Sequence, residues 1–203
     1  MDDKDPRVVD PNKKFEDFRA HWPPIDLMAT VAKEFVYDRD KYVKNLIDVG
    51  RILDAHGVKY LLAFGTLLGA IRDGGPCEGD QDVDLMVMED QESKLVHMWL
   101  ENQFLEECFC SNGFRICRVS NHILTVDRDN SYVDIYVFRP KPDGSSPGLR
   151  WCCWQYYIDD WRIINPWTMD LHCRRWNIPA QPESYLERVY GHWKIPQNRH
   201  ATT

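Results

Sequence analysis

The sequence is 203 residues long, carries a formal net charge of −7 at pH 7, and is 43% hydrophobic. This length and apolar content suffice for one sizeable buried core. We therefore expect a single domain over residues 26–203, preceded by a polar, proline-containing N-terminal arm over residues 1–25. The acidic balance argues against a general nucleic-acid binder, which would normally present a basic face.

Neither a membrane span nor a secretory signal can be recognised in the sequence. No apolar run approaches the roughly 20 residues that cross a bilayer, and the acidic start, Met1 to Asp5, does not resemble a signal peptide. We therefore expect a cytoplasmic protein without a membrane span. A lumenal location in the Golgi or secretory pathway stays open if the chain is a trimmed form.

Seven cysteines are present, an odd number at irregular spacing, which predicts reduced thiols rather than a disulfide framework. Two groups of residues are candidate zinc ligands, although neither has the paired C-x₂-C spacing that is typical of zinc sites. They are Cys108, Cys110 and Cys117, and Cys152 and Cys153 with His172 and Cys173. Zinc is therefore not the favoured cofactor.

The hydrophobic pattern predicts an α/β fold, with a small mixed sheet flanked by helices. Helices are predicted over 31–55, 67–72, 90–108 and 183–190, the last capped by Gly191. Strands are predicted over 58–64, 83–88, 114–119, 122–127 and 132–138, the last three as an antiparallel meander. A Pro- and Gly-rich loop over 141–150 precedes a tryptophan-rich C-terminal segment, whose aromatic residues we expect to build core.

Two aspartates open the strand predicted over 83–88. Because alternate residues of a strand share a face, Asp82 and Asp84 point the same way, roughly 6.6 Å apart along the backbone. Such a pair on a rigid strand suits Mg²⁺ or Mn²⁺, since Mg²⁺ prefers oxygen ligands. An acidic pair also arises by chance on a solvated strand edge, so the motifs around it decide the interpretation.

A third carboxylate lies within the strand predicted over 132–138. Asp134 is flanked by apolar residues, and burying an isolated carboxylate is costly unless it meets a cation or hydrogen-bond donors. Since neighbouring strands lie about 4.8 Å apart, Asp134 can join the first two aspartates around one or two metal ions. Asp127 is the rival candidate, but Arg128 beside it indicates a solvated turn.

Gly65 and Thr66 follow the apolar strand predicted over 58–64. A strand that ends in glycine lets backbone N–H groups approach an anion, and a short helix after it points its positive end at the same place. Alone, a Gly-Thr pair before a helix is commonly just an N-cap. The order of strand, Gly-Thr, short helix and acidic strand instead favours a phosphate-and-metal site, with Gly65 and Thr66 binding phosphate oxygens.

These residues resemble the signature of the LicD and fukutin-related family, a branch of the nucleotidyltransferase superfamily. Residues 65–72 read GTLLGAIR and residues 80–84 read DQDVD, similar to the GTLLGA-[IV]-R and D-x-D-[IV]-D segments of the family. A proline, a Tyr-Leu pair and a Tyr-Gly pair before a final proline extend the resemblance over residues 57–196. Gln81 and residues 76–79 depart from the usual pattern and leave the substrate open.

The resemblance implies a nucleotidyltransferase-like fold and a metal-dependent transferase. Family members move a phospho-alcohol group, such as phosphocholine or ribitol phosphate, from a CDP-linked donor to a sugar hydroxyl and release CMP. The metal would be held by Asp82, Asp84 and Asp134. Asp134 would alternatively activate the acceptor, and Arg72 would offset developing charge. The expected partners are a CDP-linked donor and a glycan acceptor, not nucleic acid.

Two alternative functions stay open. A nucleotidyl transfer from an NTP donor would use the same carboxylates. A catalytically inactive nucleotide- or glycan-binding module would keep the fold, although the three intact aspartates argue against it. Further candidate bases, whose ordinary roles are surface or core, are His122, His172, His192 and Lys194.

Overall fold

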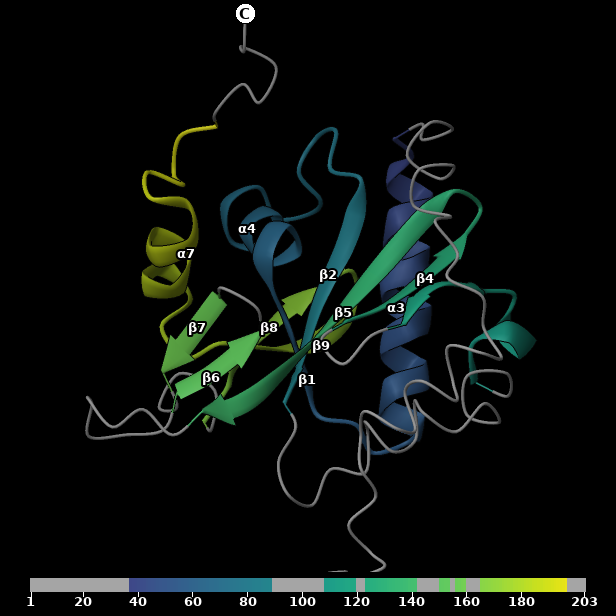
Figure 1. Ribbon diagram of the computed structural model, residues 1–203. Helices are drawn as coiled ribbons and strands as arrows, with labels where there is room; N and C mark the ends of the chain where they lie inside the picture. The colour runs from purple at the N-terminus through teal and green to yellow at the C-terminus, as the bar shows by residue number, and fades with distance from the viewer. Residues whose placement is uncertain are drawn as a thin grey trace, which may run out of the picture.

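The computed structural model describes residues 37–88, 108–119, 123–141, 150–153, 156–159 and 165–196. Within these residues the chain has the predicted mixed α/β architecture (Figure 1). The helices are α3 (Arg39–Ala55), α4 (Phe64–Arg72) and α7 (Pro182–Tyr190), with a 3₁₀ turn at Cys110–Asn112. The strands are β1 (Tyr60–Leu62), β2 (Asp82–Met88), β3 (Arg115–Val119), β4 (Ile123–Arg128), β5 (Ser131–Lys141), β6 (Arg150–Cys153), β7 (Tyr156–Asp159), β8 (Trp167–Leu171) and β9 (Arg174–Ile178).

The main sheet joins seven strands, five of them in the order β1-β2-β5-β4-β3. β2 is antiparallel to β1 and parallel to β5, while β5, β4 and β3 form the antiparallel meander that the sequence predicts. β5 is longer than expected and pairs at Lys141 with β6, which pairs with β7. The loop predicted over 141–150 therefore starts and ends in strands, and 142–149 lie outside the described residues.

The core lies between this sheet and α3. One face of β2 and β5 is apolar and completely buried at Val83, Leu85, Val133 and Ile135. α3 packs against β5 and β2 and buries apolar residues at helical spacing, Leu46, Val49 and Leu53. In Figure 1, α3 crosses behind β4 and β5, whereas α4 lies beside β2. Phe64 of α4 contacts the rings of Tyr136 and Phe138, so α4 covers the other face of the sheet.

α3 begins at Arg39 rather than at Val31 as predicted. The carboxylate of Asp38 caps the helix by accepting hydrogen bonds from two backbone N–H groups of the first turn. The two described residues before Arg39 are not helical, and residues 31–36 lie outside the description. The predicted C-terminal end at Ala55 is confirmed.

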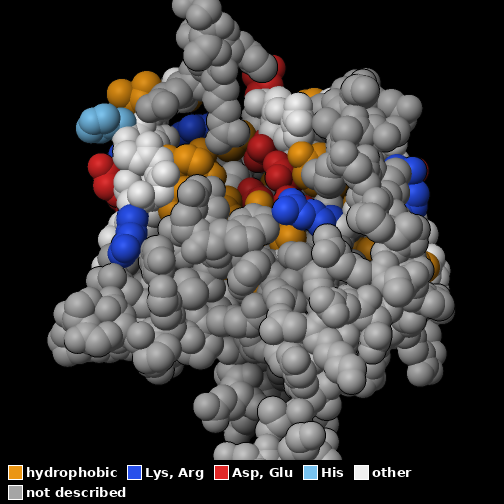
Figure 2. Space-filling view, viewed as in Figure 1, with side chains coloured by type: hydrophobic (Ala, Val, Ile, Leu, Met, Phe, Trp, Pro, Cys, Tyr) orange, Lys and Arg blue, Asp and Glu red, His pale blue; other side chains and the backbone are white. Residues whose placement is uncertain are grey.

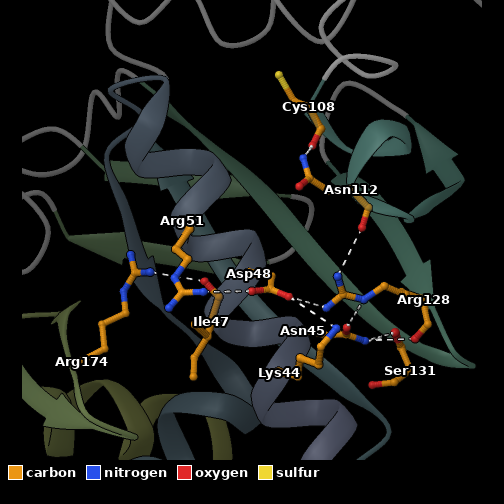
Figure 3. Close-up of polar contacts among 10 residues, drawn as sticks. All are labelled: Lys44, Asn45, Ile47, Asp48, Arg51, Cys108, Asn112, Arg128, Ser131 and Arg174. Atoms are coloured by element: carbon orange, nitrogen blue, oxygen red, sulfur yellow. Dashed lines mark hydrogen bonds and ion pairs between the residues drawn. The ribbon is translucent and has the colours of Figure 1, made fainter.

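Buried polar contacts tie α3 to the sheet (Figure 3). Asn45, which is 1% exposed, donates to the carbonyls of Arg128 and Ser131 and accepts a hydrogen bond from the Arg128 guanidinium. Asp48 pairs with the same guanidinium at 2.7 Å. α3 therefore holds both residues that flank the turn between β4 and β5, and the second of them, Ser131, lies three residues before Asp134.

α4 starts earlier than predicted and contains both Gly65 and Thr66. β1 ends at Leu62, so the predicted strand is too long and the predicted helix too short. Phe64 has a φ of 38°, a conformation that bulky residues rarely adopt. Its buried ring packs against three aromatic rings, and this contact offsets the backbone strain. Gly65 and Thr66 thus lie in the first helical turn.

The C-terminal segment adds a hairpin and a helix. β8 and β9 pair as an antiparallel hairpin that the sequence pattern did not predict. α7 confirms the predicted C-terminal helix, which ends at Tyr190 and is capped by Gly191. Trp176 and Trp193 are buried as expected, whereas Trp167 is 56% exposed.

Two predictions fall outside the described residues: the N-terminal arm and, except for Cys108, the helix over 90–108. In the part of the chain that is described, no helix has the length and apolar character needed to cross a membrane.

Candidate active site

Three carboxylates converge where β2 and β5 run side by side. Asp84 in β2 lies directly opposite Asp134 in β5, and Asp82 shares the face of Asp84. One carboxylate oxygen from each residue lies within 4.8 Å of the others. Among the described residues, this is the one group of acidic, histidine or cysteine side chains spaced to hold a metal ion. The structure therefore brings together the three carboxylates selected from the sequence.

Burial makes this arrangement electrostatically unfavourable without a cation. Asp84 and Asp134 are 5% and 6% exposed. Burial, and after it the charges of three neighbouring aspartates, raise the pKa of Asp84 well above its usual value. Burial raises the pKa of Asp134 to about 6, against the lowering effect of a hydrogen bond from Thr125. A bound divalent cation would favour the ionised forms instead.

The first turn of α4 holds Asp84 in place. The N–H of Gly65 donates to Oδ2 of Asp84 at 2.8 Å, and the Thr66 hydroxyl accepts the N–H of Asp84 at 2.8 Å. A Cβ on Gly65 would lie 2.7 Å from an oxygen of Asp80 and 3.1 Å from Asp84 Oδ2, so a larger residue there would force one of these carboxylates to move. Phosphate binding by Gly65 and Thr66 stays a prediction.

Asp134 is held by two hydroxyl groups that the sequence reasoning missed. Thr125 Oγ1 donates to Oδ1 of Asp134 at 2.5 Å, and the Tyr136 hydroxyl donates to Oδ2 at 3.4 Å. Thr125 lies directly opposite Asp134 in the pairing of β4 with β5. This contact could have been inferred from the predicted meander, because a short turn at residues 129–130 places Thr125 across from Asp134.

Two further residues near Asp84 were also missed. Asp80 lies beside Gly65. It precedes Asp82 by two residues, and this spacing could have indicated that its side chain lies on the same side as those of Asp82 and Asp84. The hydroxyl of Tyr42, from α3, lies 2.5 Å from Thr66 Oγ1. No sequence pattern pointed to Tyr42, because its contact is with a residue 24 positions away in another helix, which only the three-dimensional fold brings close.

Arg72 lies in the last turn of α4. Its guanidinium donates to the carboxylate of Asp73 at 2.9 and 2.7 Å and to the carbonyl of Trp193 at 3.4 Å. It also lies 3.4 Å from Cys77 Sγ. Asp73 therefore balances the charge of Arg72, and the expected action of Arg72 on developing phosphate charge stays a prediction.

Asp127 is not in a solvated turn, contrary to our expectation. It lies inside β4, is 1% exposed, and accepts hydrogen bonds from the Arg115 guanidinium at 3.0 and 2.6 Å. This ion pair stabilises the buried carboxylate. Asp127 is not part of the three-carboxylate group.

The candidate zinc ligands and bases do not join a metal-ligand group in the part of the chain that is described. Of the cysteines whose side chains are described, Cys77, Cys117 and Cys173 are free thiols. The side chains of Cys152 and Cys153, and all of His122, lie outside the described residues. Lys194 pairs with Glu183 at 2.9 Å.

On the molecular surface, acidic side chains gather near the middle of the face that carries the site, between hydrophobic side chains and beside a basic one (Figure 2). These acidic side chains therefore lie in a mixed environment, with apolar surface and positive charge close by.

The sequence profile described as LicD/FKTN/FKRP, nucleotidyltransferase domain, matches residues 57–177, more than half of the chain. The chain belongs to this family. The matched range contains the three carboxylates and all of α4, and the family confirms the nucleotidyltransferase-type domain that the motifs imply.

More distant likenesses accompany the family match. The uncharacterized protein RT0683 of Rickettsia typhi is 30% identical over 96 residues, 47% of this chain. The chain spans about a quarter of that relative, since the match covers 28% of its length. The antibiotic-resistance factor ANT(2'')-Ia in solution is 12% identical, with a TM-score of 0.49 over 81% of this chain and 79% of the other. ANT(2'')-Ia in complex with adenylyl-2''-tobramycin is also 12% identical, with a TM-score of 0.42 over 76% and 80%. Likenesses this remote carry no information about the activity of this chain.

Proposed function

We propose that the protein is a metal-dependent transferase that moves a phospho-alcohol group from a CDP-linked donor to a sugar hydroxyl and releases CMP. The observation that carries the proposal is the group formed by Asp82, Asp84 and Asp134, whose carboxylate oxygens lie within 4.8 Å of one another inside a LicD-type domain. Phosphocholine and ribitol phosphate are the expected transferred groups.

The donor set fits Mg²⁺ or Mn²⁺. Hard divalent cations prefer oxygen ligands, and the three carboxylates supply them from two adjacent strands. The raised pKa values of Asp84 and Asp134 are the expected sign of a site built for positive charge. When bound, such a cation supplies Lewis-acid stabilisation of the diphosphate and of the leaving CMP.

The chain's own residues would orient the reacting groups. The Gly65 N–H fixes the carboxylate of Asp84, and Thr125 fixes that of Asp134. Asp134 then has two possible tasks: to complete the metal site, or to accept the proton of the attacking sugar hydroxyl. Its pKa of about 6 leaves it mostly ionised at pH 7, as a general base must be.

The direct test is a panel of donors assayed with the purified protein. CDP-choline and CDP-ribitol are incubated with glycan acceptors and Mg²⁺, and CMP release is measured with and without EDTA. We expect metal-dependent CMP release that is lost in Asp84→Asn. An Asp170→Asn variant is the matched control, because Asp170 is exposed and pairs with Arg175 outside the site.

A nucleotidyl transfer is the second candidate, favoured by the family's description as a nucleotidyltransferase domain. Pyrophosphate release from CTP or ATP in the same assay would support it over the first. Calorimetry with each nucleotide tests both candidates together. If no nucleotide binds at millimolar concentration, both enzyme functions are wrong and a glycan-binding module remains.

A further inference from the structure

A buried hydrogen-bond chain connects α3 to the carboxylate group. The Tyr42 hydroxyl lies 2.5 Å from Thr66 Oγ1, and Thr66 Oγ1 accepts the backbone N–H of Asp84 at 2.8 Å. All three residues are buried, at 2%, 3% and 5% exposure respectively. They come from three different elements, α3, α4 and β2, which meet at this point.

The chemistry of the Thr66 hydroxyl explains why a second partner matters. A hydroxyl has one proton and two lone pairs, and it rotates freely unless its partners fix it. The Thr66 hydroxyl oxygen accepts the N–H of Asp84 through one lone pair. Its hydrogen bond with the Tyr42 hydroxyl then fixes the rotation of the Thr66 hydroxyl group. Asp84 is then held at both ends, because Gly65 binds its carboxylate at 2.8 Å.

We propose that Tyr42 is a positioning residue for the metal site, which acts through Thr66 to hold Asp84 in the geometry that binds the cation. The inference rests on the proposed metal-dependent function, since it gives a role to a residue outside the carboxylate group. Partners of this kind commonly set the affinity of a metal site without touching the metal.

A purely structural role makes a different prediction. If Tyr42 contributes only to packing, removing its hydroxyl would lower the stability of the fold and leave metal affinity unchanged. Tyr60 offers a matched control, because it is a buried tyrosine whose hydroxyl donates to the carbonyl of Gly50 in a different part of the core.

The test is the Mn²⁺ affinity of the full chain, measured by calorimetry or by the paramagnetic resonance of free Mn²⁺. We expect Thr66→Val to weaken Mn²⁺ binding about 10- to 100-fold, the range typical of such partners, and Tyr42→Phe about 3- to 10-fold. Thr66→Ser should stay near wild type, because it keeps the hydroxyl. Tyr60→Phe should bind Mn²⁺ as the wild type does.

The double variant Tyr42→Phe with Thr66→Val separates action through Thr66 from an independent effect. If Tyr42 acts through Thr66, the double variant should match Thr66→Val within about twofold, the usual limit of additivity errors. Wild-type affinity in Tyr42→Phe, or fully additive losses, would overturn the inference. Absence of Mn²⁺ binding by the wild type would instead overturn the proposed metal site.

Discussion

Gly65 is the residue whose substitution probes the site most directly. A Cβ there would meet Asp80 and Asp84 oxygens at 2.7 and 3.1 Å, distances at which one of the carboxylates must move. We expect Gly65→Ala to weaken Mn²⁺ binding at least tenfold, a loss in the range of disturbed partner residues, measured by calorimetry.

Gly57→Ala is the matched control for Gly65→Ala. Gly57 has a φ of 67° and no atom within 4 Å of an added Cβ, so alanine introduces backbone strain without entering the site. Both variants should lose stability. Equal Mn²⁺ affinity in the two variants would contradict the account of Gly65.

In the proposed site, Asp84 supports activity but lowers the stability of the protein without metal. Asp84→Asn removes a ligand, so metal-dependent turnover should fall by about a hundredfold or more, beyond the effect of a partner residue. It also removes a buried carboxyl group whose pKa is raised in the folded protein, and such a group disfavours the native state at neutral pH. The melting temperature without metal at pH 7 should therefore rise by about 2 °C or more.

Two outcomes would contradict this prediction for Asp84: turnover that survives in Asp84→Asn, or a melting temperature that falls. Asp170→Asn, an exposed change of the same charge, should alter neither quantity.

Sequence reasoning found the carboxylates because strand alternation is a local property. The register of β2 against β5 then brought Asp84 and Asp134 together as expected. The contact of Tyr42 with Thr66 could not be predicted, because it joins residues 24 positions apart in two different helices, which only the tertiary fold brings together. The start of α4 was misplaced because Phe64 adopts a positive φ, which its buried ring contacts stabilise and its residue type does not signal.

At the scale of elements, α3 is held by polar contacts as well as by its apolar stripe (Figure 3). Asn45→Ala would remove the donor to two carbonyls, at 3.1 and 2.8 Å, and the acceptor for the Arg128 guanidinium, at 2.9 Å. A buried polar group left without a hydrogen bond costs about 1–3 kcal/mol, so the free energy of unfolding measured in urea should fall by an amount of that size.

Asn112→Ala is the control for Asn45→Ala, because Asn112 is exposed and makes one side-chain hydrogen bond, to the carbonyl of Cys108. We expect Asn112→Ala to lower the free energy of unfolding by less than about 1 kcal/mol, as for the loss of an ordinary hydrogen bond. Similar losses in the two variants would show that the contacts of Asn45 contribute little.

The β8–β9 hairpin escaped prediction for two physical reasons. Its turn places His172 and Cys173 at positive φ, where hairpins usually carry Asn-Gly or Asp-Gly. Its strands alternate between exposed and buried residues only in part, since Trp167 faces solvent. The β3–β4–β5 meander, by contrast, has polar turns and apolar strands that local pattern identifies.

At the scale of the whole molecule, the acidic group should control how stability without metal depends on pH. The folded pKa of Asp134, about 6, lies above its usual value of 3.8, and that of Asp84 is also raised. At Asp134 the native state then binds more protons than the unfolded state between about pH 4 and 6, so this group stabilises the fold in acid and loses that effect as the pH rises through 6; the raised pKa of Asp84 acts in the same direction. For Asp134 the difference is about 3 kcal/mol.

The measurement is the melting temperature in EDTA from pH 4 to 8, for the wild type and for Asp84→Asn with Asp134→Asn. Other carboxylates act oppositely: the Arg72 guanidinium lowers the pKa of Asp73, which stabilises the fold above its unfolded pKa. The difference between the two profiles isolates the site. It should shrink as the pH falls towards 4, and a constant difference would contradict the assignment.

β2 and β5 run parallel, unlike the other strand pairs among the described residues. About fifty residues separate Asp84 from Asp134, so their pairing closes a long stretch of chain and is a slow, non-local step in folding. The meander can form before it from local contacts. A cation that binds to both strands can bind only after they have paired. It should therefore lower the unfolding rate and leave the refolding rate unchanged, so that metal increases the kinetic stability of the native state.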